Sequence, residues 1–158
     1  MQLSTYIRVF FGVVFAVFAL APAAQAAALT QNERALLGAV NEARAANGLR
    51  PLRVDATLTR AARSYSSTLI RTDVFTHGAL GARLARAGAQ GPVFGENLAW
   101  GSGSRATAQG IVRGWLASPG HRANVLRPGW TRIGLGAKVG EFMGRGGATV
   151  VTANFAGR

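Results

Sequence analysis

The stretch of residues 114–128, Gly-Trp-Leu-Ala-Ser-Pro-Gly-His-Arg-Ala-Asn-Val-Leu-Arg-Pro, contains one of the two histidines of the chain. Apolar residues recur at helical spacing up to Leu116 and predict a helix there. Pro119 and Gly120 predict that this helix stops at a sharp turn, because proline restricts the residue before it and glycine adopts angles closed to other residues. His121 comes directly after the turn, so we expect a rigid corner to aim its imidazole.

Three short motifs occur in a fixed order along the chain. They are Phe75-Thr76-His77, then Gly95-Glu96-Asn97-Leu98-Ala99, then Trp115 followed by Ser118-Pro119-Gly120-His121-Arg122-Ala123-Asn124-Val125-Leu126. Together they resemble the bacterial, single-domain form of the CAP superfamily, which comprises cysteine-rich secretory proteins, antigen 5 and pathogenesis-related 1 proteins and is also called SCP-like extracellular. The resemblance covers residues 36–155.

The resemblance implies a cavity that contains both histidines and one glutamate. Two imidazoles and a carboxylate form an acceptable open ligand set for Zn²⁺ or another divalent cation, with a position left for water or substrate. The metal ligands would be His77, Glu96 and His121, and the residues that support the cavity would be Asn97, Ser118 and Asn124. We expect Asn124 to bond to the backbone and hold the corner that aims His121.

The chain departs from the family pattern at one cavity position. Many CAP proteins carry a second glutamate three residues after the tryptophan, where this chain has Ser118. The loss of this carboxylate weakens the transfer of any activity that needs two carboxylates in the cavity.

Cysteine is also absent, unlike in the disulfide-bonded eukaryotic members, so a core or a bound ion must supply the stability.

Glu96 has two interpretations. Its neighbours in the extended segment 93–100 are mostly apolar, and a carboxylate there is costly to bury unless it is paired or meets an ion. In the simpler interpretation Glu96 forms an ion pair with an arginine. In the functional one it lies beside His77 and His121 as a base, a hydrogen-bonding orienter or a metal neighbour. The resemblance favours the functional interpretation.

The N-terminal segment is typical of an exported protein. A continuous apolar run at residues 9–20 follows Arg8 and precedes an Ala-Gln-Ala sequence that ends at Ala26. This pattern predicts a signal peptide at residues 1–26 and a mature domain at 27–158, because the run is short for a bilayer span. We therefore expect a secreted or periplasmic protein with no transmembrane span after cleavage; the alternative is an uncleaved anchor.

The charge balance is strongly basic. The chain has 18 basic and 6 acidic residues, a net charge of +12, and all but one of the basic residues are arginine. Arginine pairs with phosphate and carboxylate, so an anionic envelope surface is a natural partner. The arginines are scattered and no nucleic-acid motif is present, which argues against a specific nucleic-acid partner. The resemblance adds a lipid or a sterol as a ligand.

The order of predicted elements indicates an α+β domain. Capping residues predict two long helices, one after Thr30 and one after Asp55. Two strands follow at residues 133–139 and 148–155, joined by a glycine-rich loop at 140–147. Helices first and antiparallel strands later give a layered α+β fold. The resemblance sharpens this expectation to a three-layer α-β-α sandwich with a mostly antiparallel sheet.

Three functions are compatible with these residues. The preferred one is a secreted binding module whose His/Glu cavity takes a divalent metal and a lipid, sterol or envelope ligand. The first alternative is a metal-dependent hydrolase directed at protein or cell wall, with Glu96 as its base. The second is a purely structural exported module. Binding is preferred because the chain has no His-Glu-x-x-His helix and offers no clear catalytic residue.

Overall fold

Two long strands form the centre of a four-stranded sheet in this computed structural model, which describes residues 28–158. Strands β3 (Trp130–Phe142) and β4 (Arg145–Gly157) pair antiparallel. Strand β2 (Val93–Gly101) pairs antiparallel with β4, and the short β1 (Arg53–Val54) pairs parallel with β3. The order is β1-β3-β4-β2, so the prediction of a mostly antiparallel sheet is confirmed. The predicted signal peptide lies outside the described residues.

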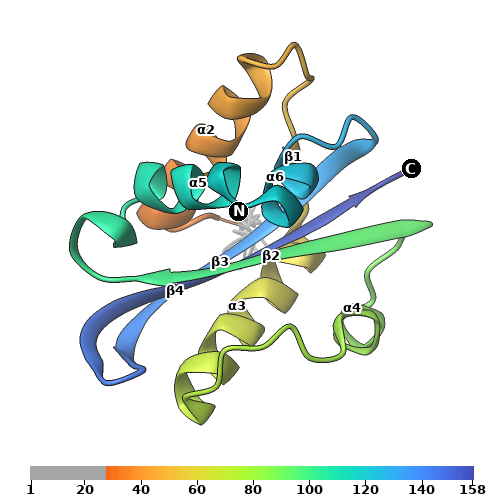
Figure 1. Cartoon of the computed structure of the whole chain (residues 1–158). Helices are drawn as coiled ribbons and strands as arrows, with labels where there is room; N and C mark the ends of the chain where they lie inside the picture. The colour runs from red at the N-terminus through yellow and green to blue at the C-terminus, as the bar shows by residue number, and fades with distance from the viewer. Residues whose placement is uncertain (1–27) are drawn as a thin grey trace, which may run out of the picture.

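Helices cover both faces of this sheet (Figure 1). One face carries α2 (Gln31–Ala45), α5 (Ala108–Ala117) and α6 (Pro119–Val125). The other carries α3 (Ala56–Thr72), against which α4 (Leu80–Ala87) packs, and a 3₁₀ turn η1 (Gly103–Ala106) connects β2 to α5. The predicted three-layer α-β-α sandwich is confirmed. No helix within residues 28–158 is both long and apolar enough to cross a membrane.

The two long N-terminal helices begin at the predicted caps. The Thr30 side chain accepts a hydrogen bond from the Glu33 backbone N–H, and the Glu33 carboxylate accepts one from the Thr30 backbone N–H, which completes a capping box. Asp55 accepts from the backbone N–H groups of Thr57 and Leu58 at the start of α3. Local hydrogen bonds therefore fix where α2 and α3 start.

Small residues allow α3 to lie directly on β3. A Cβ atom at Gly134 would be 2.1 Å from the Leu58 carbonyl carbon, and one at Gly136 would be 2.4 Å from that of Ala62. The larger residues that alternate with these glycines, such as Leu135, face the opposite layer and join the core under α2 and α5. The alternation of large and small residues thus gives each sheet face a different packing distance.

A buried arginine joins α2 to the end of α6. Arg44 is fully buried, and its guanidinium donates to the backbone carbonyls of Arg50 at 3.0 Å, Val125 at 2.8 Å and Arg127 at 3.1 Å. Burial lowers the pKa of Arg44 from its ordinary value. The place of this residue in the core was not predicted, because nothing local marks one arginine among so many.

The predicted turn after α5 is wrong in one respect. Pro119 does not end a helix but begins α6, and Ser118 is the extended residue between the two helices, with φ −103° and ψ 121°. Proline is favoured at the first helical position, since its missing N–H would be unpaired there in any case. His121 therefore lies on the first turn of a short helix rather than on a loop.

The strands also extend further than predicted. β3 and β4 continue through most of the glycine-rich segment 140–147, and the turn between them is at Met143 and Gly144, both with positive φ. Strand β1 was not predicted from the sequence. Its two residues carry no pattern of their own and are a strand because β3 lies beside them.

Candidate functional site

His77 lies in the loop between α3 and α4, and its backbone is fixed from both sides. The Tyr65 hydroxyl donates to the Thr76 carbonyl at 2.6 Å, and Arg83 donates to the His77 carbonyl at 2.9 Å. Gly78 has a φ of +55°, and a Cβ there would be 2.8 Å from the Tyr65 hydroxyl, so glycine is required after the histidine. The His77 side chain is 56% exposed. The loop therefore presents this imidazole to solvent from a rigid base.

Glu96 on β2 is buried and uses both carboxylate oxygens. Its Oε1 lies 2.8 Å from His77 Nδ1, and its Oε2 accepts from Arg83 Nη2 at 2.7 Å. The side chain is only 2% exposed. Both interpretations of Glu96 therefore describe real contacts, the arginine ion pair and the orientation of a histidine. Because the carboxylate accepts at Nδ1, the neutral His77 ring keeps its lone pair on Nε2.

His121 is held by neighbours on two elements. Its Nδ1 lies 3.0 Å from the Ser118 hydroxyl, and its carbonyl accepts from the Asn97 side chain at 3.0 Å. Asn124 donates to the Glu96 carbonyl and to Asn97 Oδ1, both at 3.0 Å. The expected backbone bond of Asn124 is thus made to β2, and it is Asn97 that holds His121. The two amides connect α6 to the strand that carries Glu96.

Burial lowers the pKa of His121, and the charge of His77 lowers it further. Neutral imidazole is the form that binds a metal ion. The surroundings therefore keep His121 in that form at a lower pH than an isolated histidine would allow.

A cavity of about 530 Å³ adjoins His121 and lies between the end of β2 and α5. Apolar residues such as Leu98, Trp100 and Ile111 line it, together with Ser118, Arg105 and Arg113. His77 and Glu96 are not among the described residues that line it. Trp115 borders the cavity as a core residue, since it is buried and its indole N–H donates to the Leu98 carbonyl at 2.9 Å. The structure thus places His121 at the edge of a separate pocket.

The donor set limits what kind of metal site this can be. Within residues 28–158, no group of three or more His, Cys, Asp or Glu side chains could hold a metal ion. Glu96 is engaged by His77 and Arg83 through both oxygens, so the free donors are the Nε2 atoms of the two histidines. Two imidazoles fit a divalent cation that takes its remaining ligands from water or a bound molecule.

Arg83 and Tyr65 are the site residues that the sequence did not identify. The Arg83 guanidinium lies 3.4 Å above the centre of the Tyr65 ring, and it bonds to Glu96 and to the His77 carbonyl. One signal was available: a buried glutamate in so basic a chain needs a cation, and Arg83 follows His77 by only six residues. Nothing in the sequence, however, distinguished Arg83 from the other arginines.

The chain is similar to several bacterial proteins. The sequence model of the cysteine-rich secretory protein family matches residues 37–155. The uncharacterized protein YkwD of Bacillus subtilis is 33% identical over 109 residues, which cover 66% of this chain and 41% of YkwD. An extracellular SCP-domain protein from Bacillus anthracis matches with a TM-score of 0.65 and 26% identity, over 83% of this chain and 45% of that one. An outer surface protein of Borrelia burgdorferi matches in fold with a TM-score of 0.67 and 22% identity, over 82% of this chain and 94% of that one.

Proposed function

Since the chain belongs to the cysteine-rich secretory protein (CAP) family, we propose that it is an exported binding module in which His77 and His121 hold a divalent cation such as Zn²⁺. The chain spans less than half the length of YkwD and of the B. anthracis protein, so this proposal concerns the domain alone. A bound cation would supply Lewis acidity and open positions for a ligand.

The observation that carries the proposal is the contact between Glu96 and His77. A carboxylate that accepts from one imidazole nitrogen fixes the tautomer and the ring orientation, and raises the basicity of the other nitrogen. Glu96 is buried and fixed by Arg83, so it holds His77 Nδ1 at 2.8 Å without moving. Ser118 makes a weaker contact of the same kind with His121. Each histidine thus has one nitrogen held by the protein and one nitrogen free.

The cavity beside His121 supports an organic ligand next to the cation. Its lining includes the apolar residues Trp100, Ile111 and Trp115 and the cationic residues Arg105 and Arg113. A pocket with an apolar floor and a few cationic groups suits a molecule with an apolar body and an anionic group. A lipid fits this description better than a neutral sterol or glycan does.

An extracellular location agrees with the SCP-domain neighbour from B. anthracis, which is described as extracellular.

The same contacts favour binding over hydrolysis. A general base must accept a proton from water near the substrate. Both oxygens of Glu96 already accept from Arg83 and His77, and the side chain is almost fully buried. Ser118 stands where a second glutamate would be needed. Glu96, the base assigned in the hydrolase alternative, is therefore not free to take up this proton.

Zinc titration by calorimetry on the purified protein tests the proposal. We expect one equivalent to bind, and we expect His77→Ala and His121→Ala each to abolish binding at the same concentration. Glu42→Gln is the matched control, because it removes an exposed carboxylate from α2. If wild type does not bind zinc, or if either histidine variant binds as wild type does, the metal proposal is wrong and the structural alternative gains support.

A further inference from the structure

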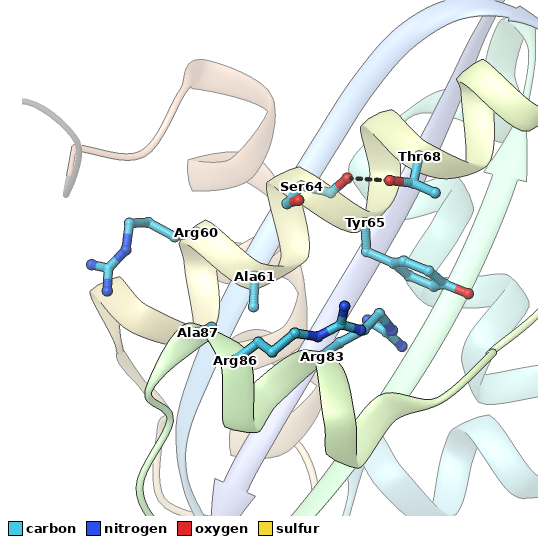
Figure 2. A pocket seen from close by; sticks show the side chains of 8 residues that line it. All are labelled: Arg60, Ala61, Ser64, Tyr65, Thr68, Arg83, Arg86 and Ala87. Carbon is cyan, nitrogen blue, oxygen red and sulfur yellow. Dashed lines mark hydrogen bonds between the residues drawn. The ribbon is translucent and has the colours of Figure 1, made fainter.

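A second hollow, of about 530 Å³, lies between α3 and α4, in the helical layer opposite α5 and α6. Six of its eight lining residues have polar side chains, namely Arg60, Ser64, Tyr65, Thr68, Arg83 and Arg86. Figure 2 shows that Arg83 and Arg86 extend from α4 toward Tyr65 of α3, while Arg60 points away at the other end. We call this hollow the α3/α4 groove. It is distinct from the cavity beside His121.

The groove carries uncompensated positive charge. None of its lining residues is acidic. In the described part of the chain, the ion pairs of acidic side chains with arginine are Glu33 with Arg63, Asp55 with Arg132 and Glu96 with Arg83. Arg60 and Arg86 belong to none of these pairs. Arg86 donates instead to the Ala82 carbonyl of its own helix, and its side chain is exposed. An anion in the groove would therefore meet charge that no carboxylate of the described residues neutralises.

Arg83 supplies an independent sign of an anion site. Its Nη2 is fully used by Glu96 and by the His77 carbonyl. Its Nε and Nη1 atoms are buried and have no hydrogen-bond partner, and among the described residues only Trp130 Nε1 shares this state. A buried donor without a partner is uncommon and costly, so these two donors favour a ligand that brings an acceptor. Stacking on Tyr65 places the Arg83 guanidinium next to the groove.

We propose that the α3/α4 groove binds a phosphate group, either free phosphate or a phosphate ester on a larger molecule. Guanidinium groups bind phosphate oxygens in two-point fashion, and hydroxyls donate to the oxygens that remain. Arg83 provides the two unpaired donors, which are buried and reach an anion when the guanidinium shifts toward the groove. Arg86 is exposed on the surface and provides a second guanidinium. Ser64 offers a hydroxyl from α3, whereas the Thr68 hydroxyl already donates to the Ser64 carbonyl at 3.1 Å. A phosphate has enough oxygens to satisfy these donors together.

An anion bound in the groove would also change the hydrogen bonds that hold His77. The Arg83 guanidinium that faces the groove is the one that bonds to Glu96 and to the His77 carbonyl. An anion that draws Arg83 toward the groove weakens those bonds. This inference does not depend on metal binding, because every group that it uses lies outside the pair of free imidazole nitrogens.

Phosphate titration followed by ¹H–¹⁵N NMR of arginine Nε–H groups tests the inference at constant ionic strength, with chloride as the reference anion. We expect the Arg83 Nε–H resonance to shift with a saturating curve. Arg86→Gln should weaken the affinity about tenfold, since a hydrogen bond to a charged group is lost. Arg122→Gln is the matched control, because Arg122 is also an exposed arginine but lies on α6, in the layer on the opposite face of the sheet. It should change the affinity by less than about twofold.

The outcomes separate specific binding from general attraction. Equal weakening by both variants means that net charge alone attracts phosphate, and it overturns the inference. An Arg83 resonance that does not move overturns it as well. Both variants keep Arg83, so the fold and the Glu96 ion pair stay in place. Co-sedimentation with phosphatidylcholine vesicles, with and without phosphatidic acid, shows whether a lipid headgroup also enters: Arg86-dependent binding to the acidic vesicles supports a lipid source, and its absence assigns the groove to soluble phosphates.

Discussion

The chain buries two glutamates, Glu33 and Glu96, and uses them differently. The Glu33 side chain is 1% exposed, and the Arg63 guanidinium donates hydrogen bonds to both of its carboxylate oxygens, at 2.8 Å and 2.5 Å. The backbone N–H of Thr30 completes its set of donors. Glu96 is 2% exposed, but it gives one oxygen to Arg83 and the other to a histidine that is more than half exposed. All the partners of Glu33 that are named here belong to the scaffold. Glu96, in contrast, is bonded to an imidazole that is exposed to solvent.

The difference in partners assigns Glu33 to the scaffold and Glu96 to the candidate site. Burial alone raises the pKa of Glu33, but the hydrogen bonds from Arg63 and Thr30 outweigh it, so the net pKa is lowered and the pair stays ionised. The pair links α2 to α3 and has no group left to offer a ligand. Glu96 is satisfied just as fully, yet its partner His77 keeps one nitrogen free. A buried charge thus points to function when one of its partners can still bind something else.

The largest effect in this comparison is expected for Glu33→Gln. The amide cannot satisfy Arg63 and the Thr30 N–H together, so the free energy of unfolding should fall by about 2–3 kcal/mol. The loss stays below that of a wholly buried pair because the Arg63 side chain is 30% exposed. Urea unfolding measures it, and Glu42→Gln should change stability by less than about 0.5 kcal/mol. Zinc affinity should be unchanged; if it falls, Glu33 is not scaffold alone.

Glu96→Gln should act mainly on binding. The glutamine amide can donate to His77 Nδ1, which moves the ring proton to Nε2 and blocks the nitrogen that would hold the metal. We expect zinc affinity to fall about 10- to 100-fold, as is typical when such an orienting partner is lost. Calorimetry gives the affinity, and the His77 ring nitrogens in ¹⁵N NMR show the tautomer. Wild-type affinity in a folded Glu96→Gln protein would contradict the assigned role.

The pH dependence should reveal the environment of His121. Its pKa is lowered below the ordinary value of 6.5, so the unfolded chain takes up the proton first as pH falls. This contribution to stability is therefore complete above pH 6.5 and is lost as pH falls through the pKa of the folded state. Over that range the free energy of unfolding should decline with falling pH. The decline should be less steep than the roughly 1.4 kcal/mol per pH unit that one full proton would give. His121→Gln should flatten the decline, and an identical slope in the variant would show that other groups cause it.

The smallest effect is expected for Ser118→Ala. The hydroxyl contact with His121 Nδ1 is 3.0 Å and only partly buried, and a neutral hydrogen bond of this kind contributes about 0.5–1 kcal/mol. Zinc affinity should therefore fall about two- to fivefold, clearly less than for Glu96→Gln. Calorimetry on both variants under one condition gives the ratio. A larger loss for Ser118→Ala would reverse the ranking of the two orienting groups.

Local signals predicted much of this fold, and distant contacts account for what the sequence did not reveal. The starts of α2 and α3 were predicted because Thr30 and Asp55 bond within their own first turns. The prediction at Pro119 was wrong because proline both ends helices and begins them, and only the surroundings select one outcome. Arg83 was missed because its bond to Glu96 joins two elements. The residues of the site and several of their supporting partners could be named from the resemblance, but Arg83 and Tyr65 could not.

The buried Arg44 has a consequence for the order of folding. It joins α2 to carbonyls 81 and 83 residues further along the chain, at the end of the helix that carries His121. Contacts between residues so far apart form slowly, because a long loop must close first. The end of α6 is therefore fixed by a contact with the first helix of the described chain, whereas His77 and Arg83 lie within one local segment. We therefore expect the part of the site around His121 to assemble after the segment that contains His77 and Arg83.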